Sequence, residues 1–274
     1  MTALLSHTNT IPAATLSLSV GSSTNLANIK SPQVPVPFAD ITTTAGAFTL
    51  SAAFTATPVR VLALLLTDLQ AGAEIRLNVY AGGSPLFGEH VPYVVDGNFY
   101  VVDGLVYSVL TAQTEYISEL EPVGSRQTIL VTLPETVTAD EVRVFVDGAQ
   151  ASVRVASLWC APAFELPLAV GWGFQPQDYS LTSRVGPNPW INRRRRNRVF
   201  SGTVERLLEA DAIGPDGLEP LFRDLGSSSP VLFLPRSTPA YQRLGIYGLL
   251  DPPGRVSHVR GPIYRAEIDI NEIA

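Results

Sequence analysis

Apolar and polar residues alternate along several short stretches of this chain, which is the pattern of strands with one buried face. The alternation is strictest at 74–80, and it returns at 141–147 and 264–271. An unbroken apolar run at 59–66 predicts a strand that is buried on both faces. Many short strands between Gly, Pro and Asp turns, without helical periodicity, predict an antiparallel β-sandwich or jelly roll over the first part of the chain. We also expect a hairpin in which the strands 141–147 and 152–159 pair across the turn at Gly148.

The pattern changes in the second part of the chain. Strand candidates come first, at 169–174, 179–185 and 198–204. Apolar residues then follow at helical spacing, and we expect two short helices from Val204, Leu207, Leu208, Ala212, Leu218, Leu221, Phe222 and Leu225. Three further strands are predicted at 230–235, 245–250 and 264–271. The order predicts a smaller α+β domain, so that the whole chain is mainly β.

Charge divides the chain at the proline-containing passage 161–167. Residues 1–165 carry six basic side chains against fourteen acidic ones, whereas residues 166–274 carry thirteen arginines against eleven carboxylates. A composition shift at such a passage is typical of a domain boundary. We therefore expect a β-sandwich domain at 1–165 and an α+β domain at 166–274.

A run of arginines early in the second domain is the strongest local feature of the sequence. It consists of Arg193, Arg194, Arg195, Arg196 and Arg198, with Trp190 just before it. Guanidinium groups so close together repel one another unless carboxylates, phosphates or water surround them. We favour a subunit interface in which these residues meet carboxylates of a neighbouring copy, given the acidic first domain, over a solvated loop. Nucleic-acid binding ranks third, because the net charge of −6 is negative.

Other residues indicate packing rather than chemistry. Cys160 is the single cysteine and lies among apolar neighbours, so we expect a buried, inert thiol. Trp159 and Trp172 are expected in cores or between domains, whereas Trp190 is the tryptophan that we allow as an interface anchor.

Catalytic and cofactor motifs are missing from the sequence. His7, His90 and His258 lie far apart, and there is no H-E-x-x-H, G-x-S-x-G or paired cysteine motif. Three turn aspartates, Asp96, Asp103 and Asp147, have the chemistry to ligate calcium, yet turn aspartates usually cap backbone amides. We expect no enzyme activity, no cofactor and no metal. The start of the chain lacks a basic and apolar leader pattern, and the longest apolar run is far shorter than a membrane span.

The ordered set of motifs in the second domain resembles the minor or distal tail proteins of long-tailed bacteriophages, which form rings at the tail tip. The resemblance covers about 166–274, and it rests on the segments 174–184, 199–205, 221–226, 230–235, 246–250 and 264–270. The first domain looks like the galactose-binding-like jelly roll that some relatives carry in front of this core. There the segments 25–32 and 154–164 match an early loop and the last strand.

The resemblance implies a structural protein of the virion, located at the tail tip and made in the host cytoplasm. Its implied partners are copies of itself, six in the ring or else three, together with the tail tube and the baseplate or fibre proteins. DNA in the tail lumen would make transient contact only, and no membrane partner is expected. Two alternatives stay open: a carbohydrate-binding adhesion module that contacts host glycans, and a hydrolase of surface polysaccharide whose paired carboxylates are hidden in the sequence. We also expect the closing strand 264–270 to offer an edge for strand addition.

Overall fold

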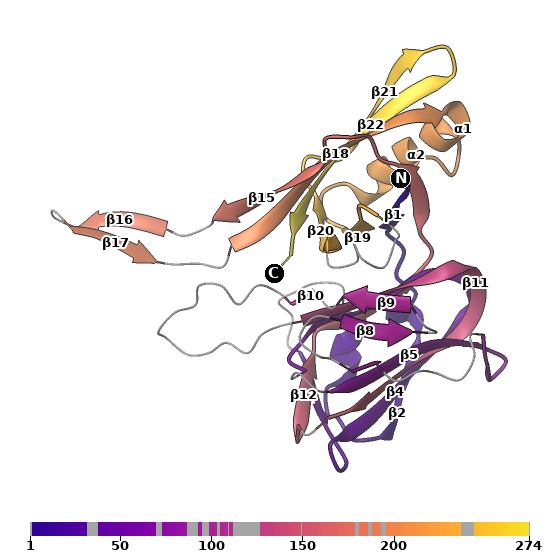
Figure 1. Ribbon diagram of the computed structural model, residues 1–274, viewed down its shortest axis with the longest axis vertical. Coiled ribbons are helices and arrows are strands. Elements are labelled where there is room, and N and C mark those ends of the chain that lie inside the picture. The colour runs from indigo at the N-terminus through magenta and orange to yellow at the C-terminus, as the bar shows by residue number, and fades with distance from the viewer. Residues whose placement is uncertain are drawn as a thin grey trace.

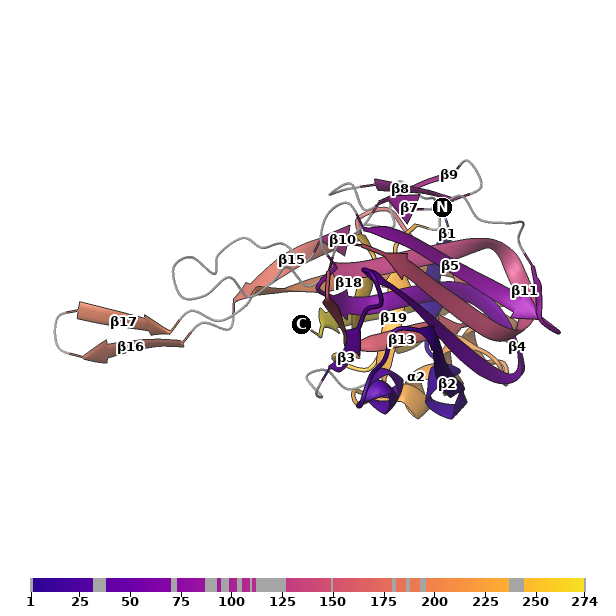
Figure 2. The same ribbon diagram turned by 90° about the horizontal axis from the view of Figure 1, so that it is seen from below.

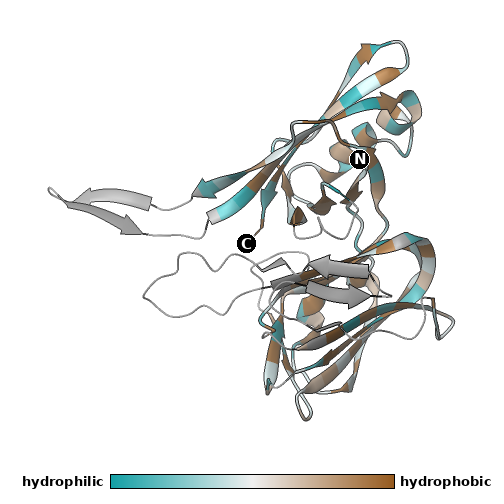
Figure 3. Ribbon diagram, in the orientation of Figure 1, coloured by the Kyte–Doolittle hydropathy of each residue, from teal (hydrophilic) through white to brown (hydrophobic). Residues whose placement is uncertain are grey.

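The structure is a computed structural model, and it confirms the mainly β fold class. It describes residues 2–31, 38–69, 73–86, 93–94, 99–102, 105–108, 110–111, 127–148, 150–178, 181–185, 188–192, 196–236 and 244–273. Two β-bodies lie one above the other in Figure 1, and the strand pairs among the described residues are antiparallel. Apolar residues, brown in Figure 3, alternate with polar ones along the strands of both bodies.

The first body is built around one large sheet with the order β13-β4-β11-β5-β6, to which β2, β7 and β10 add at the sides. Smaller sheets are formed by β3 with β12 and by β8 with β9. The strands of this body are β2 (Thr15–Val20), β3 (Ala39–Thr42), β4 (Ala47–Thr67), β5 (Glu74–Ala81), β6 (Ser84–Pro85), β7 (Tyr93–Val94), β8 (Phe99–Val102), β9 (Leu105–Ser108), β10 (Leu110–Thr111), β11 (Gln127–Asp147), β12 (Ser152–Val155) and β13 (Ser157–Ala161). Short 3-10 helices lie at Ile11–Ala13 and Leu26–Lys30.

The length of β4 and β11 shapes this first body. Each has 21 residues, and their pairing is interrupted by register shifts, one of them between Thr132 and Val137. Such irregularities bend a strand and increase its twist, so one strand can serve both ends of a curved sheet. The inner face of the sheet and the β3–β12 pair share a core that includes Phe48, Leu50 and Val144.

The second body is a small barrel. Its main path is β14-β1-β19-β20-β22-β18, with β15 added to β18 and β21 added to β22. Leu168 bridges Val204, and the amide of Ala169 donates to the carbonyl of Thr203 at 2.8 Å, so the end of β14 meets β18 and the sheet closes. The elements are β1 (Thr2–Ser6), β14 (Phe164–Pro167), β15 (Gly173–Asp178), β18 (Arg196–Leu208), α1 (Glu209–Ile213), α2 (Leu218–Leu225), β19 (Pro230–Leu234), β20 (Ile246–Leu250), β21 (Arg255–Arg260) and β22 (Ile263–Glu272).

Side chains from alternate positions of the barrel strands fill its interior, where Phe233 and Ile268 are fully buried. Helix α2 supplies Leu221 and Phe222 to the same core, which explains why its apolar residues fall on one stripe. Gly254 passes so close to the Phe222 ring that an added Cβ would lie 2.5 Å from it. Only glycine therefore fits at this approach without repacking.

The two bodies share a third apolar cluster. It joins β1, β19 and β20 of the barrel to β4, β11 and β13 of the sandwich, and its members include Leu4, Val61, Trp159, Leu234 and Tyr247. The rings of Trp159 and Tyr247 meet edge to face at 5.6 Å, and burial raises the pKa of the Tyr247 phenol. We conclude that the sandwich and the barrel pack through a buried apolar contact rather than being joined only by a linker.

Polar groups at the margin of this contact are paired. The indole Nε1 of Trp159 donates to Ser6 Oγ at 2.9 Å, and Ser6 Oγ donates to the carbonyl of Pro162 at 2.7 Å. The guanidinium of Arg60 lies between Glu165, at 3.2 Å, and the carbonyl of Leu133. The buried polar atoms of these residues are therefore satisfied within the chain.

The N-terminal strand departs from the expected division into 1–165 and 166–274. Strand β1 lies in the barrel, where Leu4 pairs with Glu165 of β14 and with Leu234 of β19. The chain thus begins in the second body, forms the sandwich, and returns to the barrel at β14. A five-residue strand with three apolar residues at its centre carries no sign in its sequence of a partner so far along the chain.

Three expectations about local structure are wrong. The strands at 141–147 and 152–159 form no hairpin, because β11 pairs with β4 and β5 whereas β12 pairs with β3. The closing strand β22 is not a free edge, since β18, β20 and β21 all pair with it. Residues 204–208 belong to β18, and α1 starts only at Glu209.

The false helical stripe at 204–208 has a clear physical origin. The pairing of β18 with β22 shifts register between Val204 and Leu207, and Arg206 inside this interval has φ of 58°. A bulge adds a residue to one strand, so two inward-facing residues end up three positions apart instead of two. Val204 and Leu207 are both buried for this reason.

Candidate assembly interface

A two-stranded ribbon extends away from both bodies (Figures 1 and 2). It is made of β16 (Leu181–Val185) and β17 (Asn188–Asn192), which we call the arm. Its register runs from Leu181 opposite Asn192 to Val185 opposite Asn188. The arm follows β15 and precedes β18, so the barrel strands lead directly into it.

Aromatic rings pack β15 and β18 against the barrel core. Trp172, Phe174 and Phe200 contact one another with centroid distances of 5.4 to 6.2 Å, and Phe200 continues to Phe233 in the barrel core at 4.4 Å. This chain of rings ties β15 and β18 to the interior of the barrel.

The residues predicted for an interface lie in and beside the arm. Trp190 is in β17, opposite Ser183, and Arg196 is the first residue of β18, opposite Asp178. The side chains of Trp190 and Arg196 lie outside the described part of the structure. Arg193, Arg194 and Arg195 also lie outside the described residues. The contact of these residues with a second copy stays a prediction.

Arg198 has partners within its own chain. Its guanidinium makes a forked pair with Glu272, with Nη2 to Oε1 at 2.6 Å and Nε to Oε2 at 3.2 Å. Nη2 also donates to the carbonyl of Gly245 at 3.0 Å, and the group lies 5.5 Å from the centre of the Phe174 ring. Arg198 thus joins β18 to the end of β22, and its expected role between copies stays a prediction too.

Exposed carboxylates are concentrated in residues 205–224, which contain the end of β18, helix α1 and most of helix α2. They are Glu205, Glu209, Asp211, Asp216, Glu219 and Asp224, and each of these residues is exposed. We call this set the acidic face. Residues 205–224 contain six carboxylates and two arginines. A count of charges over segments of this length would therefore have found the acidic face in the sequence.

Exposed apolar side chains accompany the acidic face. Leu208, which precedes α1, is 61% exposed, and Ile213, its last residue, is 44% exposed. Large apolar side chains rimmed by polar groups are typical of surfaces that bind other proteins. The face therefore combines charge with apolar area.

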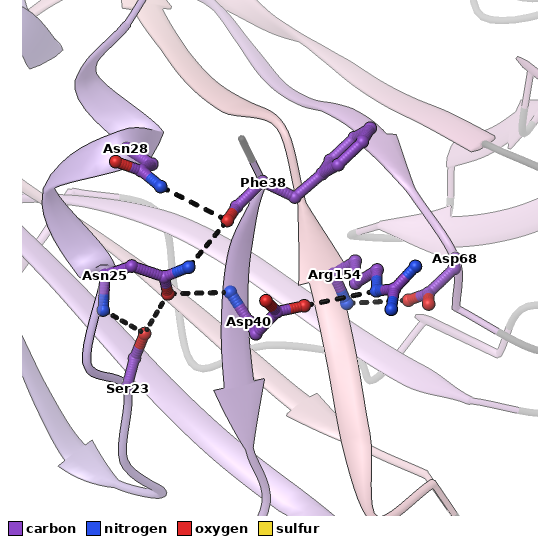
Figure 4. A network of polar contacts seen from close by, with 7 residues as sticks. All are labelled: Ser23, Asn25, Asn28, Phe38, Asp40, Asp68 and Arg154. Atoms are coloured by element: carbon purple, nitrogen blue, oxygen red, sulfur yellow. Dashed lines mark hydrogen bonds and ion pairs between the residues drawn. The ribbon is translucent and has the colours of Figure 1, made fainter. Parts of the chain in front are cut away.

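A polar network at one end of the sandwich holds loops together (Figure 4). Asn25 Nδ2 donates to the carbonyl of Phe38 at 2.8 Å, and its Oδ1 accepts from the amide of Asp40 at 2.9 Å. Arg154 Nε donates to Asp40 at 3.1 Å, while its backbone amide donates to Asp68 at 2.7 Å. These groups hydrogen-bond one another, which suits a structural role.

A second polar cluster lies on the sheet face, where Arg143 makes a bidentate pair with Glu141, both distances being 2.7 Å. The same guanidinium lies 4.0 Å from the centre of the Tyr80 ring, so it covers this ring. The hydrogen bond from Arg143 is the main cause that lowers the pKa of Glu141. The pair is an internal stacked unit rather than an open aromatic platform.

The described residues contain no metal-binding group of three or more His, Cys, Asp or Glu. His7 lies on the Phe164 ring, and burial lowers its pKa. His258 hydrogen-bonds the carbonyl of Gly261, and Asp147 is exposed at the end of β11. His90, Asp96 and Asp103 lie outside the described residues, so their predicted roles are untested. No helix in the described part of the chain is long and apolar enough to span a membrane.

A comparison with solved structures finds a structural neighbour of part of the chain. It is the family 32 carbohydrate-binding module from C. perfringens NanJ in complex with galactose, with a TM-score of 0.36 and 12% sequence identity. The match covers 56% of this chain and 98% of the module. No family model and no curated protein matches the chain.

Proposed function

We propose that this protein is a structural subunit of a bacteriophage tail tip, and that it assembles with copies of itself through its barrel domain. The observation that carries the proposal is the arm, a two-stranded ribbon that lies between the barrel strands β15 and β18 in the chain and stands apart from both bodies. The similarity to tail-tip proteins in the order of sequence motifs supports the same role. Binding, not chemistry, is the work that we assign to the chain.

The low stability of an isolated two-stranded ribbon is the reason why the arm supports assembly. An isolated two-stranded hairpin is at best marginally stable in water, because it has no second layer to bury its apolar residues. The arm nevertheless carries Leu181, Val185, Trp190 and Ile191 in its ten paired positions. A surface of another chain would supply the missing layer.

The remaining parts of the proposal follow from the resemblance of the second domain to tail-tip proteins. The ring would contain six copies, or three, and would join the tail tube to the baseplate or fibre, with the sandwich facing outward. Contact of the sandwich with host glycans is the alternative function, and it stays a prediction.

The proposal is tested with the purified full-length chain. Static light scattering gives its mass in solution, and negative-stain electron microscopy of the same sample shows its shape. We expect rings of one defined subunit number. A chain that stays monomeric at every concentration, and that binds a glycan array, would instead favour the adhesion function.

The arginine run gives a second test of the same proposal. Replacing Arg193, Arg194, Arg195 and Arg196 by Ser removes four charges next to the arm. We expect an unchanged far-UV circular dichroism spectrum together with loss of the ring. A variant that still forms rings as the original chain does would remove these arginines from the interface.

A further inference from the structure

We propose that two copies of the chain pack together through the helical end of the barrel, with the β21–β22 hairpin of each copy on the acidic face of the other. This contact goes beyond the proposed function, because it uses neither the arm nor the arginine run. Three observations carry it: the opposite charges of the hairpin and the acidic face, their positions side by side, and the exposed apolar residues around them.

The hairpin and the acidic face carry opposite charges. Residues 252–266, which contain β21 and the start of β22, include Arg255, Arg260 and Arg265 and no carboxylate. All three arginines are exposed, as are the six carboxylates of the acidic face. Opposite potentials of this kind speed the encounter of two partners and fix their orientation.

Most of these charges have no ion pair within the described part of the chain. On the hairpin, Arg265 pairs with Glu267 at 3.4 Å, whereas Arg255 and Arg260 pair with no described carboxylate. On the acidic face, Glu219 has an ion pair at 3.8 Å, whereas the carboxylates of α1 pair with no described basic residue. Guanidinium and carboxylate groups that are open in this way suit one another, because arginine binds a carboxylate through two hydrogen bonds.

Strand pairing places the hairpin and the acidic face side by side. Ile263 of β22 lies opposite Arg260 of β21 and also opposite Leu208 of β18. Neighbouring strands are about 5 Å apart, so Arg260 and Leu208 lie roughly 10 Å from each other. Leu208 directly precedes Glu209, the first residue of α1. The two charged regions therefore adjoin at one end of the barrel, where Figure 1 shows α1 beside the hairpin.

Exposed apolar residues lie within both charged regions. Val259, beside Arg260 in β21, is 53% exposed. Leu208 and Ile213 are exposed at the two ends of α1. Apolar side chains surrounded by charged ones are the usual anatomy of a specific contact between proteins.

Contacts within the chain hold the hairpin beside the helices. His258 hydrogen-bonds the carbonyl of Gly261 at 2.8 Å, and its ring lies against Tyr264 with the ring centres 5.1 Å apart. At the base of the hairpin, Gly254 lies close against the ring of Phe222 in α2. The surface is thus formed before a partner binds, which lowers the entropy cost of association.

The neighbouring positions of the two charges decide the symmetry. A surface that carries both charges side by side is complementary to itself when one copy is turned by 180° relative to the other. The hairpin of each copy then lies over the acidic face of the other, and both contacts form in one closed pair. A head-to-tail arrangement would form one such contact at each step and leave the other surfaces open.

The test asks which carboxylate an amine at position 260 reaches. The variant Arg260→Lys of the full-length chain keeps the positive charge and supplies an amine, which a carbodiimide couples to a carboxylate in direct contact. The unmodified chain, whose single lysine is Lys30, gives the background. Denaturing gel electrophoresis separates the products by the number of chains joined, and far-UV circular dichroism checks that each variant folds.

We expect Arg260→Lys to give a product of two chains above the background at about 50 mM salt, and less of it at about 500 mM salt, because salt screens the contact. The series of products should end at two chains, since each pair is closed. Adding Glu209→Gln and Asp211→Asn should lower the yield of this product at least about tenfold. Adding Glu135→Gln and Asp147→Asn instead, at exposed positions of the sandwich, should leave it unchanged.

Different outcomes overturn different claims. A yield of the two-chain product no higher than the background at low salt would overturn the contact. A series that continues to three or more chains would overturn its two-fold symmetry. A product that survives the loss of Glu209 and Asp211 would overturn the acidic face as the receiving surface. Each of these results leaves the proposed tail-tip role standing, because the rings expected from the unmodified chain are observed separately by electron microscopy.

Discussion

Trp159 and Cys160 are neighbours on β13, yet they belong to different cores. Cys160 points into the core of the sandwich, whereas Trp159 belongs to the cluster between the two bodies. All five residues of β13 are buried for this reason, because one face of the strand meets the sandwich and the other meets the barrel. The sequence analysis expected both residues to be buried, and the structure confirms this.

Cys160 should resist thiol reagents in the native protein. Burial raises the pKa of its thiol to about 12, and the thiolate is the reactive form. At pH 8 only about one thiol in ten thousand would be ionised. We expect no reaction with a disulfide reagent such as dithionitrobenzoate until the chain unfolds, followed by one equivalent in guanidinium chloride. Fast reaction without denaturant would show that the core around β13 opens readily.

At the scale of elements, the sequence predicted what regular alternation can reveal. Strands β5 and β22 lie close to the predicted ranges because apolar and polar residues alternate along them, and β19 and β20 do so because each is a short apolar segment between turns. The bulged elements could not be predicted in the same way. In β18 an extra residue shifts the alternation of buried and exposed positions. The last apolar residues of the strand are therefore spaced as they would be in a helix.

Arg206 offers a test of that bulge. Its φ of 58° lies in the left-handed region, where β-branched side chains are strongly disfavoured. We expect Arg206→Val to lower the free energy of unfolding by about 1–2 kcal/mol, as measured by urea denaturation. The matched change Glu205→Val, at the exposed residue before it, should cost little, because Val suits a strand. Equal effects of the two substitutions would contradict a left-handed bulge at Arg206.

At the scale of the whole molecule, charge revealed part of the organisation and contacts between distant segments supplied the rest. The shift near 161–167 coincides with the return of the chain to the barrel at β14. The place of β1 was not predictable, because Leu4 pairs with Leu234 near the other end of the chain. The same holds for the candidate interface. The arginine run is visible in the sequence, but only the strand pairing shows that the run follows a two-stranded ribbon.

The cluster between the bodies predicts that the sandwich and the barrel unfold together. Leu4 and Leu5 allow a matched test, because both are leucines of β1 with no exposed area, yet Leu4 belongs to the cluster between the bodies and Leu5 to the barrel core. Either change to alanine should cost about 2–5 kcal/mol, since it removes a buried side chain and leaves a cavity. Loss of Leu5 weakens the barrel but leaves the contact between the bodies intact. We therefore expect Leu5→Ala to keep one transition in urea, with a lower midpoint and an unchanged slope.

Leu4→Ala acts on the contact that couples the two bodies. We expect its urea transition, followed by far-UV circular dichroism, to become broader or to divide into two steps, with a smaller apparent slope than in the unmodified chain. The slope matters here because it reports the surface exposed in one cooperative step, and uncoupled bodies expose their surfaces in separate steps. If Leu4→Ala instead shifts the midpoint while the slope stays equal to that of Leu5→Ala, the cluster would add stability without coupling the sandwich to the barrel.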